Sequence, residues 1–160
     1  MKTMDRALYW DDLAPGLRHR SGGRTITEAD LVNFVNASWL TEGLFTSVDS
    51  AEREHSVLSG RVVPGALVYA YAEGLAKRTM EGVGLAFLEA TLVMRAPTRV
   101  GDTIHVECEV VERKLTSKPG RAVLRSCIDV VNQEGATVMT YTAVRLIRAP
   151  GEGIATKALP

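Results

Sequence analysis

Hydrophobic and polar residues alternate along the last third of the chain, a pattern typical of half-buried β-strands. Residues 103–114 show it most clearly, with Ile104, Val106, Cys108 and Val110 on one face and polar residues on the other. Similar runs cover residues 122–132 and 136–148, and short turns rich in glycine, proline and polar residues separate the three runs. Three long strands joined by short turns predict an antiparallel meander. Residues 83–95 predict a further strand before it.

A different pattern occupies residues 60–80, where charge is almost absent until Lys77 and Arg78. Pro64 cannot donate a backbone hydrogen bond, so we expect a helix to begin at Pro64 or Gly65. Its apolar residues point all round the cylinder, which is typical of a buried helix. The sequence therefore predicts a sheet wrapped around a central helix.

The first third of the chain predicts less regular structure. Thr27 is a suitable N-cap with Asp30 three residues later, which indicates a helix from Glu28 to about Ser38. A short strand is expected near residues 7–10, followed by a polar turn at 15–23 in which His19 is solvated.

Residues 39–59 show neither the period of a helix nor that of a strand. Residues 49–55 could form one helical turn. An irregular segment of this length is unusual in a compact domain and is often functional. We therefore expect it to form the wall of any site.

Composition limits the class of protein. A chain of 160 residues fits one domain, here residues 1–150, with a loose tail at 151–160. Lys and Arg number 19 and Asp and Glu also 19, so nucleic acid and membranes are not expected partners. No apolar run reaches the ~18 residues of a spanning helix and no signal peptide is visible, which predicts a cytoplasmic protein. Cys108 and Cys127 lie far apart in strands and are expected to be reduced thiols that bind no metal.

A long buried helix followed by a meander predicts an α+β protein with the hotdog fold. Four segments then carry a resemblance: Arg-Thr-Ile-Thr-Glu-Ala-Asp at 24–30, the irregular stretch at 34–49, Gly-Arg-Val-Val-Pro-Gly at 60–65, and Pro-Thr-Arg-Val-Gly-Asp-Thr-Ile at 97–104. In this order they resemble the MaoC-like family of hydratases and dehydratases that act on acyl thioesters.

The resemblance implies an enoyl-CoA hydratase or acyl dehydratase, which is a lyase, acting on an acyl-CoA or acyl-carrier thioester without a further cofactor. It also implies a homodimer or higher oligomer, since hotdog protomers commonly pair their sheets edge to edge. Two alternatives stay open on the same fold. One is a thioesterase, and the other is a non-catalytic acyl-thioester-binding or partner subunit.

One motif of the family is missing. Family members with hydratase activity carry Asp-x-Asn-Pro-x-His in the irregular segment, where Asp and His hold the attacking water. Residues 40–49 contain neither Asn-Pro nor His. The Asp and His positions fall on Leu40 and Phe45 in one alignment, and near Glu42 and Ser47 in the other. The usual catalytic pair is therefore not recognisable here.

The helix start can still be carried over from the family. The first N–H groups of a helix lack internal partners and can bind an oxyanion, a role that the resemblance gives to the Gly65 N–H. Pro64, Arg61 and Phe45 are expected to surround the substrate. A plain helix start at Gly65, and an Arg61 that ties loops together, are the structural alternatives.

The remaining candidates come from residue type and position. Glu42 is the best acid/base candidate, because burial among Leu40, Leu44 and Phe45 would favour its protonated form. A solvated loop glutamate is the alternative, as an exposed side chain is for His55, the second catalytic candidate. Lys118 and Arg121 flank a hairpin and could bind the phosphates of coenzyme A, although a solvated hairpin explains them equally well.

Overall fold

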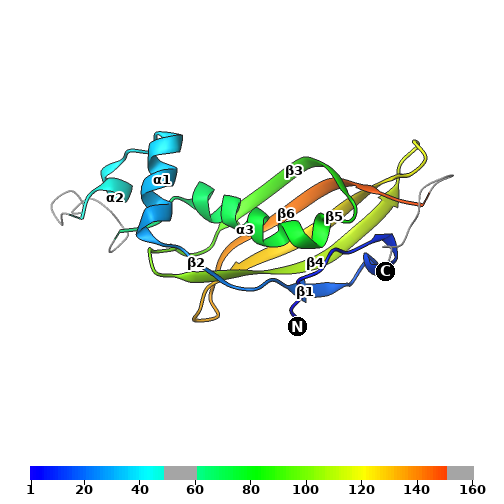
Figure 1. The fold of residues 1–160 in the computed structure, drawn as a ribbon, viewed down its shortest axis with the longest axis horizontal. Coiled ribbons are helices and arrows are strands. Elements are labelled where there is room, and N and C mark those ends of the chain that lie inside the picture. The colour runs from blue at the N-terminus through cyan, green and yellow to red at the C-terminus, as the bar shows by residue number, and fades with distance from the viewer. Residues whose placement is uncertain (49–60, 151–160) are drawn as a thin grey trace.

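The computed structural model describes residues 1–48 and 61–150, which form one antiparallel sheet wrapped around a central helix. The sheet has six strands in the order β1-β4-β5-β6-β3, and β2 pairs with β4 beside this path. Helix α3 (Gly65–Met80) crosses the inner face of the sheet (Figure 1). The strands are β1 (Arg18–Arg20), β2 (Arg24–Thr25), β3 (Gly84–Met94), β4 (Thr103–Leu115), β5 (Arg121–Val131) and β6 (Thr137–Arg148). The predicted hotdog fold is confirmed.

The meander formed by β4, β5 and β6 has the predicted faces. On β4, Ile104, Val106 and Cys108 are buried in the core cluster that includes α3, and Val110 is buried in a second cluster with Leu8 and Leu13. The residues between them are partly or fully exposed. Both cysteines are free thiols, and burial raises the pKa of Cys108 to about 11. Strand β3 follows the helix and pairs with β6 at the edge of the sheet. Alternation of period two was therefore a reliable signal for the sheet.

Helix α3 begins at Gly65 with Pro64 as its N-cap, as predicted. Its burial, however, is one-sided. Leu67, Val68, Ala72 and Ala76 are buried by the sheet, whereas the small residues Ala66, Ala70 and Gly74 are exposed. The expectation that the helix is buried all round is wrong for the single chain, because one curved sheet covers only one side of it.

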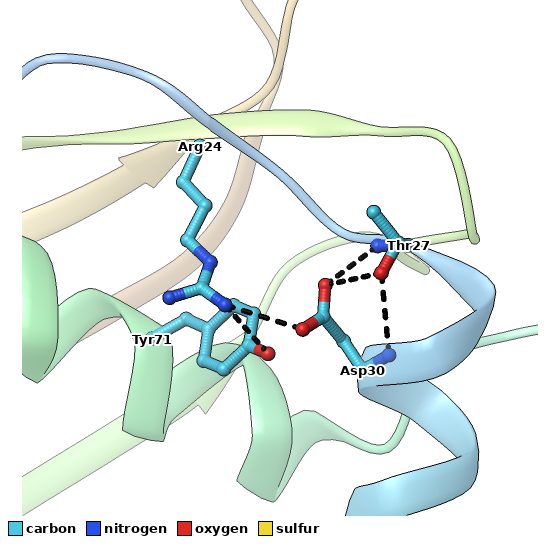
Figure 2. Close-up of polar contacts among 4 residues, drawn as sticks. All are labelled: Arg24, Thr27, Asp30 and Tyr71. Carbon is cyan, nitrogen blue, oxygen red and sulfur yellow. Dashed lines mark hydrogen bonds and ion pairs between the residues drawn. The ribbon is translucent and has the colours of Figure 1, made fainter.

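Helix α1 (Glu28–Ser38) also has the predicted start. Thr27 Oγ1 accepts from the Asp30 N–H, and the Asp30 carboxylate accepts from the Thr27 N–H at 2.8 Å, forming a reciprocal cap. Arg24 extends this cap (Figure 2) by donating to Asp30 at 3.2 Å and to the Tyr71 hydroxyl at 3.1 Å. These contacts join β2, α1 and α3.

Two predictions near the N-terminus are wrong. Residues 7–10 form no strand. Instead a 3-10 turn, η1 (Trp10–Asp12), follows Leu8, whose N–H donates to the Thr79 carbonyl of the helix end rather than to a strand. His19 is not solvated but 3% exposed, because β1 pairs with β4 and places His19 opposite Cys108. Burial lowers the pKa of His19.

Several predictions concern residues that the structure leaves undescribed. The possible helical turn at 49–55, His55, Asp49, Gly60 and the tail at 151–160 all lie outside the described residues. In the described ranges, no helix combines the length and the apolar character needed to cross a membrane.

Candidate functional site

A pocket of about 330 Å³ lies at the start of α3, between the short helix α2 (Gly43–Thr46) and the end of β3. Its described walls are mostly apolar, and they bring together Phe45 and Gly65 from the predicted site. The lining residues are Leu44, Phe45, Val62, Val63, Gly65, Met94, Arg95, Ala96, Pro97 and Thr98. The irregular segment therefore does contribute a wall to a pocket, through Leu44 and Phe45.

Gly65 is placed where a side chain would meet the opposite wall. A Cβ at this position would lie 2.9 Å from the Met94 sulfur, closer than ordinary packing allows. Its φ is not positive, so the need for glycine here is a matter of space rather than of backbone conformation. The pocket wall and the helix backbone thus approach each other most closely at the first residue of α3.

The start of α3 also leaves hydrogen-bond donors available. The Leu67 and Val68 N–H groups both donate to the Pro64 carbonyl. Within residues 1–48 and 61–150, the N–H groups of Gly65 and Ala66 have no acceptor. They lie at the positive end of the helix dipole, and Gly65 also lines the pocket, so an oxygen atom there could accept from them.

Arg61 is engaged in structural contacts. Its Nε donates to the Phe45 carbonyl at 2.9 Å, and its Nη1 forms an ion pair with Glu28. The guanidinium therefore connects α1 to the α2 wall of the pocket. Arg61 is also absent from the pocket lining, so this arrangement matches the loop-tying interpretation better than the expected contact with the substrate.

Glu42 does not reach the pocket. It is the N-cap of α2, its side chain is exposed, and it is absent from the pocket lining. The expected burial among Leu40, Leu44 and Phe45 is wrong, because α2 begins directly after Glu42 and directs Leu44 and Phe45, rather than the carboxylate, to the pocket. No carboxylate or imidazole occurs among the described lining residues.

Lys118 and Arg121 lie at the opposite end of the molecule from α1 and α2 (Figure 1), in the hairpin between β4 and β5. Both are exposed, and Arg121 lines a separate depression with Leu85 and Arg148. Within one chain, they are therefore not brought to the Gly65 pocket.

The structure also shows a polar cluster that the sequence interpretation did not anticipate. Glu73 of α3 accepts hydrogen bonds from Tyr141 and Arg145 of β6, beside a second pocket of about 300 Å³. Two signals were available. Glu73 is the only charge in α3 before Lys77, and Arg145 occupies an inward position between buried Ala143 and Ile147.

Two curated proteins are similar to this chain in sequence. No family model matches the chain. It is 28% identical over 107 residues to a 3-hydroxybutyryl-CoA dehydratase of Methylorubrum extorquens. The aligned region covers 67% of this chain and 66% of that protein. It is 27% identical over 96 residues to an (R)-specific enoyl-CoA hydratase of Rhodospirillum rubrum. Here the aligned region covers 60% of this chain and 65% of that protein. The chain thus spans just under two thirds of the length of these curated relatives.

A solved structure extends the similarity over nearly the whole domain. The MaoC-like dehydratase from Rhodospirillum rubrum superposes with a TM-score of 0.77 at 26% identity, covering 90% of this chain and 99% of that one. By sequence and by structure, this chain is similar to MaoC-like proteins, and it has the hotdog fold.

Proposed function

We propose that this chain binds an acyl-coenzyme A or acyl-carrier thioester, with the thioester carbonyl at the start of α3, and that its associated chemistry is of the hydratase or dehydratase type. The observation that carries the proposal is the pair of N–H groups at Gly65 and Ala66, which have no acceptor among the described residues and lie beside an apolar pocket of about 330 Å³. The names of the two curated relatives, a dehydratase and a hydratase of CoA thioesters, support this substrate class.

The helix start suits the charge that develops in such reactions. As a thioester becomes an enolate, negative charge grows on its carbonyl oxygen, and unpaired N–H groups at a helix N-terminus stabilise that charge. The apolar walls at Leu44, Phe45 and Met94 exclude water from the acyl group. These residues bind and orient a thioester, but they do not move a proton.

For proton transfer, the described pocket lining offers neither a carboxylate nor an imidazole. We therefore expect hydration of simple straight-chain enoyl thioesters to be weak or absent. The test is the turnover of crotonyl-coenzyme A, followed by the absorbance of its double bond. A turnover number of ~1 to 1,000 per second, the usual enzyme range, would contradict this expectation. Glu42→Gln would then show whether Glu42 acts as the acid/base, because full activity in that variant would exclude it.

A non-catalytic acyl-thioester-binding subunit is the second candidate. It is favoured by the lack of a carboxylate or imidazole in the described pocket lining. Thioester hydrolysis would need a carboxylate that activates water, and the exposed Glu42 is not placed for this. A panel of enoyl- and acyl-coenzyme A thioesters separates the three functions, since hydration changes double-bond absorbance, hydrolysis releases a thiol, and binding alone does neither.

Gly65→Ala tests the site itself. Its Cβ would crowd the pocket at the flexible end of Met94, so acyl-coenzyme A binding should weaken by more than the ~1 kcal/mol of an ordinary Gly-to-Ala change, with little loss of thermal stability. Gly74→Ala, on the exposed side of the same helix and with no atom within 4 Å of its Cβ, is the matched control. Unchanged affinity in a stable Gly65→Ala protein would remove Gly65 from the site.

We also propose that the chain forms a homodimer through β3. This edge strand exposes large apolar side chains, including Leu85, Phe87, Leu88, Leu92 and Val93. Pairing β3 with its counterpart in a second copy would cover them and remove the open edge. Light scattering should report about twice 17.3 kDa, and a monomer at micromolar concentration would contradict the pairing.

A further inference from the structure

The polar cluster on α3 and β6 has the properties of a built binding surface. Glu73 Oε1 accepts from Arg145 Nη2 at 2.6 Å and from the Tyr141 hydroxyl at 2.7 Å. The Arg145 side chain is only 9% exposed. A buried ion pair is weak evidence for stability, because removing both charges from water offsets much of their attraction. Packing alone would be served as well by apolar residues, so another role is indicated.

Arg145 keeps most of its donors available. A guanidinium carries five N–H donors. Within the described ranges, the single hydrogen bond of this side chain goes from Nη2 to Glu73. Glu73 and Arg145 both line the second pocket, so the remaining donors can meet an oxygen atom of a molecule bound there.

The charges around this pocket are balanced. Glu73 forms an ion pair with Arg145. At the rim, Lys77 Nζ lies 3.8 Å from Glu81 Oε1. An anionic group would add a charge close to Glu73 and Glu81 without a free cation to balance it. An alkyl group would cover the donors of Arg145 without giving them an acceptor. A neutral hydroxyl or keto oxygen fits this pocket best.

The second pocket and the Gly65 pocket lie along the same side of α3. Residues 65, 69, 73, 76 and 80 fall within about 80° of one another around a helix with 100° per residue, and eight residues span about 12 Å. Tyr69 lies between Gly65 and Glu73 along the helix, and its ring is edge-on to that of Tyr141 at 5.2 Å between centroids. Strand β3 contributes its end, Met94, to one pocket and its start, Gly84, to the other.

We propose that the pocket at Glu73 and Arg145 receives the far end of the acyl group, and that it selects acyl chains carrying a neutral oxygen function there. This inference rests on the proposed function, since it requires the thioester to lie at Gly65. The axial rise of about 12 Å from Gly65 to Glu73 is comparable to the length of an extended decanoyl chain. Arg145 would donate to the oxygen, and a hydroxyl could also donate to the carboxylate of Glu73.

The test compares decanoyl-coenzyme A with 10-hydroxydecanoyl-coenzyme A by calorimetric titration of the full chain. We expect the hydroxylated ligand to bind at least about tenfold more tightly. If both bind with equal affinity, this inference fails while the proposed function stands. If neither binds, the proposed function fails and the inference fails with it.

A paired substitution sharpens the result. Glu73→Leu with Arg145→Met removes both charges together and should abolish or invert the preference for the hydroxylated ligand. The matched control is Glu112→Leu with Arg125→Met, which removes an ion pair with 3.7 Å between its charged atoms elsewhere on the sheet and should leave the preference unchanged. A preference that survives in the folded Glu73 and Arg145 variant would overturn the inference. If that variant does not fold, the comparison of the two ligands on the unmodified chain still decides.

Discussion

Two networks attached to α3 have the same composition, one carboxylate, one arginine and one tyrosine, but they differ in burial. In the outer network, formed by Arg24, Asp30 and Tyr71, the arginine side chain is 51% exposed. In the inner network, formed by Arg145, Glu73 and Tyr141, the arginine side chain is 9% exposed. The outer network is explained by the cap that it completes at the start of α1. The inner network caps nothing, and two of its residues, Glu73 and Arg145, line the second pocket.

The two networks also differ in the contacts that remain when one contact is lost. Asp30 accepts from Thr27 as well as from Arg24, and Arg24 also lies 3.9 Å from the centre of the Tyr71 ring. Loss of one contact leaves the others in place. In the inner network, by contrast, Arg145 and Tyr141 share one oxygen atom of Glu73. Loss of the arginine leaves a partly buried carboxylate without its counter-charge.

The largest effect is therefore expected from Arg145→Met. Breaking a buried ion pair from one side is strongly destabilising, so the free energy of unfolding should fall by about 3 kcal/mol. Arg24→Met should lower it by less than about 1 kcal/mol, because its ion pair is exposed. Urea denaturation of both variants measures the contrast. Equal losses would show that burial does not distinguish the networks.

The tyrosine hydroxyls should rank in the same order. Tyr141→Phe removes a donor to a partly buried carboxylate and should cost about 1.5 kcal/mol. Tyr71→Phe should cost about 0.5 kcal/mol, because the phenylalanine ring can still lie against Arg24. Thermal melting of the two variants checks this order, and a larger loss for Tyr71→Phe would reverse the comparison.

Thr27→Ala tests the part of the outer network that belongs to the helix cap. Loss of a threonine N-cap typically costs about 1 kcal/mol, and we expect that value here. Thr41→Ala, an exposed threonine beyond the end of α1 whose hydroxyl forms no hydrogen bond within the described residues, serves as the control. Urea denaturation gives both values, and equal losses would argue against a specific role for the cap.

The smallest effect is a dependence on pH. Hydrogen bonding from the Tyr71 hydroxyl, and then from Thr27, lowers the pKa of Asp30 below its usual range. A carboxylate with a lowered pKa stabilises the folded state above its unfolded value of about 4, and this contribution is lost as the pH falls through the folded pKa. The difference in melting temperature between the unmodified chain and Asp30→Asn should therefore be present at pH 7 and shrink toward pH 2. A constant difference would contradict the lowered pKa.

The sequence predicted the elements whose signals are local. The cap at Thr27 and Asp30, the start of α3 at Pro64 and Gly65, and the alternation in β4 all depend on residues close together in the chain. Burial of His19 was missed, because it depends on a pairing with Cys108, far away in the sequence. The proximity of Phe45 to Gly65 was expected only through the family resemblance.

The inner network was missed for a related reason. Glu73 and Arg145 are far apart in the chain, and each alone is an ordinary charged residue. Only the sheet register, which places Arg145 inward on β6, shows that the two charges meet. The prediction for Glu42 was wrong although its signal was local. Its apolar neighbours in the sequence suggested burial, but the short helix α2 leaves its side chain exposed.

The order of the strands has a consequence for how the chain is made. β3 is synthesised before the meander, yet it pairs only with β6, which ends 54 residues after Met94. At about 5 to 20 residues per second, ribosomes need about 3 to 11 seconds to produce that stretch. During this time the backbone N–H and C=O groups along β3 have no partner strand within their own chain, and an unpaired strand favours aggregation. The growing polypeptide is therefore prone to aggregate until β6 is complete.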